Sequence, residues 1–293
     1  MKKNKWLKYT NTAEEYIEPD YYDRLLKKYS FTNKSDLQIF FEWLASTKKQ
    51  NILELGSGSG RASEIVFKKR KGSKLYMVDL SGRMIKFTKN KFRKNLNTKY
   101  TISDSIEFLQ NTQDTFDTVF SLWSFSHSTH QHLHKKGLNK GSIYIKKVLN
   151  KFIKENLEIG GKFFLIHFDS MSEEQQILMK QWKKIFPIFK DSGLHQSPSK
   201  IIIDKTLLPL DQKNKIRLSI EHIEGDSIKY ESLDKLLEIF LNFHLESFFN
   251  KTRQIDGIIK EIKKLVKKHR QKDGTYEIKP SCYIYTFTKI NNI

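Results

Sequence analysis

Several residue types are scarce in this chain of 293 residues, and each scarcity excludes a class of protein. The single cysteine excludes a disulfide framework and any zinc or iron–sulfur site built from several cysteines. Five prolines and 13 glycines exclude a collagen-like or proline-rich chain. No apolar run reaches the roughly 18 residues of a membrane-spanning helix, and the basic N-terminus lacks the apolar stretch of a secretory signal. We therefore expect a cytoplasmic protein that does not enter a membrane.

Positive charge is abundant, with 53 Lys and Arg against 33 Asp and Glu and a formal net charge of +20. Such charge is typical of proteins that bind nucleic acid. Only 8 of the 53 basic residues are Arg, however, and Arg has the planar fork that suits phosphate and base recognition. Lys is accompanied here by Asn, Ile and Phe, which share A/T-rich codons, so genome composition is the alternative explanation. Hydrophobic residues make up 38% of the chain, which is enough for a sizeable core.

Short apolar segments alternate with helical patterns between residues 50 and 170. We expect a helix at 36–45 whose N-terminus is capped by Ser35. We also expect Gly160 and Gly161 to end the helix that precedes the fifth strand, as a glycine C-cap. A His-rich loop is expected after residue 124. The expected strands are 51–55, 74–80, 100–103, 116–124 and 162–168, and the expected helices between them are 61–70, 82–95, 105–110 and 142–156. This alternation predicts an open α/β sheet that is largely parallel.

The pattern changes after residue 169. We expect a helix at 173–190, an irregular stretch at 191–212, strands at 215–223 and 283–288, and helices at 232–249 and 254–271. We interpret the chain as one α/β domain over 50–293, preceded by an N-terminal helical lid over 1–49. The additions to the domain on the substrate side are an insertion at about 170–214 and the helices at about 232–271.

A glycine-rich turn with the pattern GxGxG, Gly56–Gly60, follows the first predicted strand. Such a turn lets the backbone approach a ligand closely. Asp79 ends the second strand, where a carboxylate can accept both hydroxyls of a ribose. Asp104 follows the third strand, where its carboxylate is placed to accept an exocyclic amine. The order and spacing of these features are more specific than the glycines alone.

Together these residues resemble the class I S-adenosylmethionine-dependent methyltransferases over about residues 50–170 and the closing strand. The resemblance implies an α/β fold with a seven-stranded, mostly parallel sheet, helices on both faces and a helical insertion before the sixth strand. It places the last strand antiparallel and near the edge. It also implies S-adenosylmethionine as the cofactor and S-adenosylhomocysteine as the product. The GxGxG spacing and Glu54, placed to meet an ammonium group, favour this cofactor over a dinucleotide.

The resemblance also assigns cofactor contacts position by position. It places the methionine part of the cofactor at the glycine turn, the ribose at Asp79, and the adenine between Leu80 and Met84 and beside the loop at 104–106. It places the sulfonium at the end of the fourth strand. The implied cofactor-binding residues are Glu54, Gly56, Ser57, Gly58, Gly60, Asp79, Leu80, Met84, Asp104, Ser105, Ile106, Ser121 and Leu122.

The acceptor is expected between the segment after the fourth strand, the N-terminal segment and the insertion. His127 is the candidate general base, with a structural histidine as the alternative. Trp123 and Phe125 are candidates for the walls of the acceptor site, although sheet core is the alternative for one of them. Tyr16 and Tyr22 are candidate lid residues, and ordinary helix packing is their alternative.

His130 is a further candidate for substrate contact. Its spacing to His134 also matches a pair of metal ligands on a helix, but no nearby carboxylate completes a set, so we expect no metal. The sequence lacks an (Asn/Asp)-Pro-Pro-aromatic motif after the fourth strand, which argues against adenine or a glutamine amide as the acceptor.

We expect a methyltransferase (EC 2.1.1) that acts on a small molecule at nitrogen, oxygen or carbon. RNA is the alternative acceptor, because seven lysines lie between residues 135 and 154, close in sequence to the expected methyl-transfer opening. A peptide or protein acceptor and a non-catalytic cofactor-binding protein are less favoured. The acceptor and the oligomeric state are left open by the sequence.

Overall fold

The computed structural model describes residues 19–46, 50–185, 196–244 and 254–293. Seven strands form one sheet in the order β3-β2-β1-β4-β5-β9-β6. Strands β3, β2, β1, β4 and β5 are parallel, and β9 is antiparallel to both of its neighbours, β5 and β6. The strands are β1 (Asn51–Leu55), β2 (Lys74–Asp79), β3 (Thr98–Ile102), β4 (Phe116–Leu122), β5 (Leu157–Phe168), β6 (Ile216–Glu224) and β9 (Ser281–Lys289). The predicted α/β fold is confirmed, including the last strand inserted next to the edge strand.

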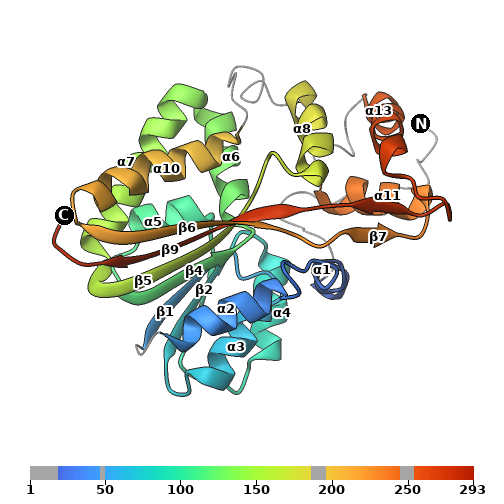
Figure 1. The fold of residues 1–293 in the computed structure, drawn as a ribbon. Helices are drawn as coiled ribbons and strands as arrows, with labels where there is room; N and C mark the ends of the chain where they lie inside the picture. Colours follow the sequence, from blue (N-terminus) through green and yellow to red (C-terminus); the bar gives the residue numbers. More distant parts are fainter. Residues whose placement is uncertain (1–18, 47–49, 186–195, 245–253) are drawn as a thin grey trace.

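Helices cover both faces of this sheet (Figure 1). One face carries α2 (Asp36–Ala45), α3 (Arg61–Lys69) and α4 (Gly82–Lys91). The other carries α5 (Ser105–Asn111), α6 (Phe125–Lys136), α7 (Leu138–Glu155) and α10 (Pro198–Gln212). Around the carboxyl ends of the parallel strands lie α1 (Pro19–Leu26), α8 (Glu173–Ile185), α11 (Leu233–Ile239) and α13 (Ile255–Val266). The insertion before the sixth strand of the sheet therefore contributes α8 and α10.

Local sequence signals account for the first elements. The hydroxyl of Ser35 accepts a hydrogen bond from the Gln38 backbone N–H, and the Gln38 side chain accepts one from the Ser35 N–H, so α2 begins with a capping box. Strands β1 and β4 lie inside the sheet and are buried along nearly their whole length. Apolar residues predominate in both strands, and the polar residues Glu54, Thr118 and Ser121 within them are buried as well.

The His-rich loop predicted after residue 124 is wrong, because this segment is the helix α6. Serine, threonine and histidine have modest helix propensity, which favoured a loop in the sequence. One side of α6 is nevertheless buried, with Phe125, Thr129 and Leu133 on it, and the helix packs against α7. Tertiary burial therefore outweighs the local preference.

Two further predictions differ from the structure. Helix α7 ends at Glu155, and Gly160 and Gly161 lie within β5, whose pairing with β4 shifts register in this stretch. The glycines thus mark a strand irregularity and not a helix end. The stretch expected to be irregular contains α10, in which Pro198 occupies the first turn, where its missing N–H costs no hydrogen bond.

The end of the chain has a second, two-stranded sheet that the sequence did not indicate, formed by β7 (Ile228–Tyr230) and β8 (Tyr276–Ile278). Helix α11 continues into a π-helical turn at Phe240–His244, and a 3-10 turn at Lys267–His269 follows α13. The ends of the helices predicted at 173–190 and 232–249 lie partly outside the described residues. The division into a lid at 1–49 and a domain at 50–293 stays a prediction.

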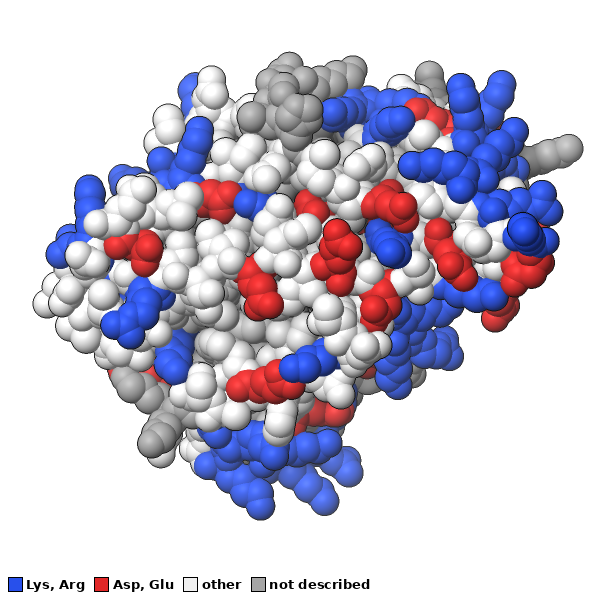
Figure 2. Space-filling model, viewed as in Figure 1, with Lys and Arg blue, Asp and Glu red and all other residues white. Residues whose placement is uncertain are grey.

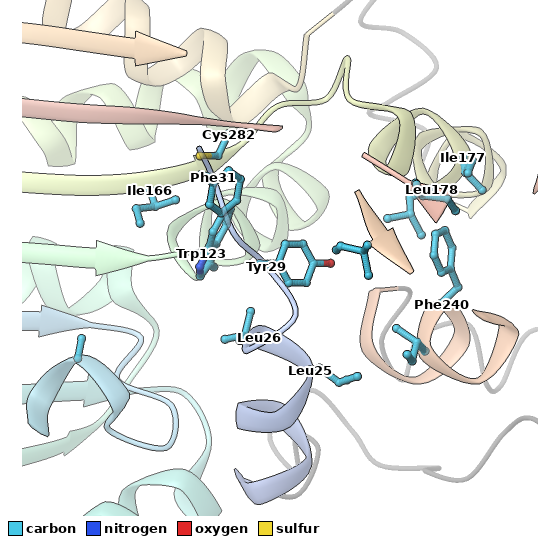
Figure 3. Packing of buried hydrophobic residues seen from close by; sticks show 14 of the residues in the cluster. Leu25, Leu26, Tyr29, Phe31, Trp123, Ile166, Ile177, Leu178, Phe240 and Cys282 are labelled. Carbon is cyan, nitrogen blue, oxygen red and sulfur yellow. The ribbon is translucent and has the colours of Figure 1, made fainter. Parts of the chain in front are cut away.

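The segment from Leu25 to Phe31 packs between the end of the sheet and helices α8 and α11 (Figure 3). The ring of Phe31 stacks on Trp123 with 5.6 Å between ring centroids. The hydroxyl of Tyr29 donates a hydrogen bond of 2.5 Å to Glu174 on α8. The segment therefore joins the carboxyl end of β4 to the inserted helix.

Candidate functional site

The glycine turn after β1 is held by the end of β2. The backbone N–H groups of Gly56 and Ser57 donate to the Val78 carbonyl at 2.8 and 3.0 Å. Gly56 has a φ of 71°, and a Cβ there would collide with the Ser124 side chain. Gly60 has a φ of 76°, and a Cβ there would lie 2.5 Å from the Phe92 ring on the C-terminal side of α4. The turn therefore needs glycine both for its backbone conformation and for its space.

Asp79 organises the loop between β1 and β2. One of its carboxylate oxygens accepts the Gly58 N–H at 2.7 Å, and the other accepts the Ser81 N–H at 2.8 Å. Burial raises the pKa of Asp79 above its ordinary value, although these two hydrogen bonds oppose the rise. The carboxylate lines the pocket described below, at the place expected for a ribose.

Glu54 lies beneath the turn and is not among the residues that line the pocket, which differs from its predicted place beside an ammonium group. Only 4% of its surface is exposed, and the hydroxyl of Ser63 on α3 donates a hydrogen bond to its carboxylate. Burial raises the pKa of Glu54 to about 8. In this structure Glu54 joins β1 to α3 beneath the turn.

Asp104 follows β3 and caps α5. Its carboxylate accepts hydrogen bonds from the Ile106 and Glu107 N–H groups, from the Ser128 hydroxyl and from the His132 ring, the last at 2.8 Å. Burial opposes the ionisation of Asp104, but the hydrogen bonds from His132 and Ser128 outweigh it and hold its pKa below the ordinary value. His132, which the sequence did not single out, thus positions the carboxylate expected near the adenine.

One pocket opens at the carboxyl ends of strands β1 to β5 and contains many of the predicted residues. On the side of the glycine turn, the predicted residues lining it are Gly56, Gly58, Asp79, Leu80, Met84, Asp104 and Ser105. On the side of α6, they are Trp123, His127 and His130. The fold therefore brings the expected cofactor contacts and the expected acceptor contacts to one space.

The other predicted contacts that the structure describes do not line this pocket. Ile106, Ser121 and Phe125 are at most 2% exposed, and Phe125 packs in the core on the α7 side of the sheet. The interpretation of Phe125 as a wall of the acceptor site is therefore wrong, and its alternative as core holds. The remaining residues of this group are Ser57 and Gly60 in the turn and Leu122, the last residue of β4.

The two candidate lid tyrosines are not placed by the structure. Tyr16 lies outside the described residues. Tyr22 lies in helix α1, but its side chain is outside the described part. The Ser59 hydroxyl of the glycine turn donates a hydrogen bond to Asp23, and Leu26 lines the pocket. Helix α1 therefore touches the expected cofactor side through these two contacts.

Trp123 is held in an unusual conformation at the end of β4. Its φ is 68°, a left-handed value that bulky residues rarely adopt. Its indole N–H donates a hydrogen bond of 2.9 Å to Asp36, which is fully buried. Asp36 also accepts both ends of the Arg61 guanidinium, at 2.9 and 3.0 Å. An N-terminal carboxylate therefore fixes the orientation of a pocket wall, a link that sequence spacing does not show.

The acceptor side also has residues that the sequence analysis did not identify. His167 and Phe168 come from the end of β5, and Gln175, Met179 and Trp182 come from α8. The sequence gives little indication of these residues, because the end of β5 has the pattern of an ordinary core strand and α8 that of an ordinary surface helix. Among the residues that the structure describes, no group of three His, Cys, Asp or Glu side chains is placed to hold a metal ion. In the same part of the chain, no helix has the length and apolarity to cross a membrane.

Known proteins resemble this chain in sequence and fold. Residues 52–140 match the family model described as a methyltransferase domain. Malonyl-[acyl-carrier protein] O-methyltransferase 1 of Ilyobacter polytropus is 32% identical over 89 residues, which are 30% of this chain and 32% of that protein. The matching part therefore spans about a third of the relative's length.

Two solved structures are similar to this chain at low sequence identity. The YcgJ protein of Bacillus subtilis is 12% identical with a TM-score of 0.51, over 87% of this chain and 98% of that one. Phosphoethanolamine N-methyltransferase 2 of Haemonchus contortus, solved with S-adenosyl-L-methionine, is 16% identical with a TM-score of 0.49, over 93% of this chain and 57% of that one. Residues 52–140 are thus similar to a methyltransferase domain, and the chain shares the fold of the YcgJ protein.

Proposed function

We propose that the protein transfers the methyl group of S-adenosylmethionine to a small-molecule acceptor, at a nitrogen, oxygen or carbon atom. The observation that carries the proposal is the shared pocket, in which Gly58 and Asp79 face the same space as Trp123 and His127. A methyl transfer needs donor and acceptor to meet in one enclosed place, because positioning supplies much of its catalysis.

The chain's residues fit the cofactor. The cradle at Gly56 has no room for a side chain, and each Asp79 oxygen accepts one backbone N–H, whereas a carboxylate oxygen can accept about two hydrogen bonds. Asp79 can therefore also accept the ribose hydroxyls. Leu80 and Met84 supply apolar contacts for the adenine, and Asp104 accepts its exocyclic amine.

The proposed chemistry divides between cofactor and protein. When bound, S-adenosylmethionine supplies a methyl carbon to which the acceptor's lone pair bonds, while the methyl–sulfur electron pair remains on sulfur and S-adenosylhomocysteine is left. His127 takes the proton that a hydroxyl or amine acceptor loses in this exchange. Trp123, fixed by Asp36, holds the acceptor against the cofactor side.

RNA remains the alternative acceptor because of the net charge of +20. Figure 2 shows Lys and Arg gathered at the end of the molecule where α3 lies and near α13, while the middle of this face carries both signs among uncharged residues. The last turn of α3 contains Lys68 and Lys69, and the last turn of α13 contains Lys263 and Lys264. None of the described residues that line the pocket is Lys or Arg, which favours the small molecule.

The named acceptor of the curated relative is malonyl-[acyl-carrier protein]. The match covers about a third of that protein, so this acceptor is not carried over to the present chain. A cytoplasmic location likewise stays a prediction from the sequence.

Calorimetric titration with S-adenosylhomocysteine tests the proposal, after the absorbance ratio has shown whether the purified protein carries nucleic acid. We expect micromolar binding by nucleic-acid-free protein. Tightly held RNA that high salt removes would favour the RNA alternative. Absence of binding would contradict the cofactor site.

A variant pair locates the site. Asp79→Ala removes the charged acceptor of the ribose hydroxyls, worth about 1.5–3 kcal/mol, so affinity should fall about 10- to 150-fold. Asp114→Asn, at an exposed carboxylate 3.4 Å from Lys99, serves as the control and should leave affinity unchanged. Equal affinities in the two variants would place the cofactor elsewhere.

A further inference from the structure

The described residues that line the acceptor side of the pocket have uncharged side chains or imidazole rings. Its described walls come from the end of β4, α6, the end of β5 and α8. They include Trp123, His127, His130, His167, Gln175 and Trp182, and the described residues contribute no Lys, Arg, Asp or Glu to this side. Asp79 and Asp104 line the opposite side, at the expected cofactor contacts.

Charged groups that lie behind these walls are paired with one another or with polar neighbours. The Lys200 ammonium lies 2.7 Å from the Asp204 carboxylate and 4.2 Å from the centre of the Tyr283 ring. Asp169 accepts the Ser281 hydroxyl at 2.7 Å and pairs with the His222 ring at 2.9 Å. These charges are therefore engaged within the fold and do not face the acceptor.

Glu174 on α8 is also turned away from the acceptor. It is 1% exposed and accepts the Tyr29 hydroxyl at 2.5 Å. Its neighbour Gln175 lines the pocket. Helix α8 therefore directs its carboxylate to the N-terminal segment and an uncharged amide to the acceptor.

Two of the three histidines on this side are neutral at physiological pH. His167 donates from Nδ1 to the Phe168 carbonyl at 2.7 Å, so in the neutral ring Nε2 accepts the Ser199 hydroxyl at 2.8 Å. Burial lowers the pKa of His167 to about 4. Burial, and then proximity to His127 and His167, lowers the pKa of His130 to about 3. A second positive charge is thus unfavourable in this group.

We infer that the acceptor is an uncharged molecule with an aromatic or apolar body and a hydroxyl or aromatic amine, and that carboxylates and phosphates are rejected. The inference rests on the proposed function. An anion entering this side would lose its hydration without meeting a fixed cation among the described lining residues, and this loss costs several kcal/mol per charge. Trp123, Trp182 and Phe168 offer ring faces to a neutral body instead. The positive charge of the protein surface therefore does not predict the charge of the acceptor.

The test uses the full chain saturated with S-adenosylhomocysteine and matched probes that differ only in charge. The probes are a panel of phenols, naphthols and indoles, each with the corresponding carboxylate, and 2-naphthol and 2-naphthoate are the first pair. Binding is followed by calorimetry and by ligand-observed NMR. We expect neutral members to bind and each carboxylate to bind at least tenfold more weakly. Carboxylates that bind as tightly as their partners, or a panel in which no neutral member binds, would overturn the inference.

A charge placed in the wall should invert this selectivity. Gln175→Lys adds a cation to the acceptor side and should raise the affinity for 2-naphthoate at least tenfold. The matched control is Gln176→Lys, which adds the same charge on the exposed neighbour and should change neither affinity. Equal effects of the two variants would show that the general charge of the protein, and not the wall, selects the ligand.

The two proposals fail in different ways. If S-adenosylhomocysteine does not bind, the proposed function fails before the probes are used. If it binds and the naphthoate binds as tightly as the naphthol, the methyltransferase proposal stands and the neutral acceptor is refuted. Thermal unfolding of both variants checks that the substitutions leave the fold intact.

Discussion

Replacing Asp36 tests whether the N-terminal part of the chain fixes the acceptor wall. Asp36 is the first residue of α2 and is fully buried. Its carboxylate accepts two hydrogen bonds from Arg61, whose side chain is 12% exposed, and one from the Trp123 indole. Asp36→Asn keeps the shape of the side chain but removes its negative charge.

The expected loss in the free energy of unfolding follows from the burial of the ion pair between Asp36 and Arg61. Removing one partner of a buried ion pair leaves the other charge without compensation and costs about 3–5 kcal/mol. Asparagine keeps one oxygen for the Trp123 N–H, so we expect the lower end, about 3 kcal/mol. The exposed pair of Lys34 and Glu42, 2.7 Å apart with both side chains about half exposed, gives the control. Glu42→Gln should cost less than about 1 kcal/mol.

Urea unfolding followed by far-ultraviolet circular dichroism measures both losses, with the slope m used to check that the transition stays two-state. The double variant Asp36→Asn/Arg61→Met should lose less than the sum of the single variants, because it leaves no unpaired charge. A loss below about 1 kcal/mol for Asp36→Asn would refute the argument, since the pair would then be as weak as a surface ion pair.

Three further predictions concern the site. His127→Ala should lower methyl transfer at least tenfold while leaving S-adenosylhomocysteine affinity unchanged, and full activity, compared with the exposed control His134→Ala, would remove its role as a base. Burial raises the pKa of Glu54 from 4.5 to about 8, so the folded state holds a proton that the unfolded chain loses in this range. The stabilisation from this bound proton is complete below pH 4.5 and is lost as the pH rises through 8. Glu54→Gln should therefore flatten the fall of Tm between pH 5 and 8. An unchanged slope of Tm against pH would contradict the raised pKa of Glu54. Gly60→Ala should lower the free energy of unfolding by about 2–4 kcal/mol, because of its left-handed backbone and the collision with Phe92. Gly72→Ala, with a φ of 84° and open space around it, should lower it by only about 1–2 kcal/mol in the same urea assay.

The alternation of strands and helices was readable from the sequence because it depends on neighbouring residues. The short strand segments at 51–55 and 116–122, the capping box at Ser35 and the glycine turn are local patterns with local causes. They led to the correct sheet and to the edge of it where the pocket lies. Asp79 was likewise identifiable, because its position follows from the end of β2.

The elements that were predicted wrongly owe their structure to distant contacts. Helix α6 forms although its own residues favour a loop, because one side of it is buried against α7. Gly160 and Gly161 belong to a strand because β5 pairs with β4 at Leu157, before the glycines. No sequence pattern within these segments indicates the neighbouring helix or strand whose contacts determine their structure.

The sequence by itself determined the fold class and the edge of the sheet where a ligand would lie, since hydrophobic periodicity and turn chemistry act over a few residues. Only the tertiary structure decided which side chains share the pocket. Asp36 meets Trp123 across 87 positions, His132 meets Asp104 across 28, and Tyr29 meets Glu174 across 145. The lack of Lys, Arg, Asp and Glu among the described lining residues of the acceptor side is also a property of the fold, because it depends on where each charged side chain turns and with which partner it pairs.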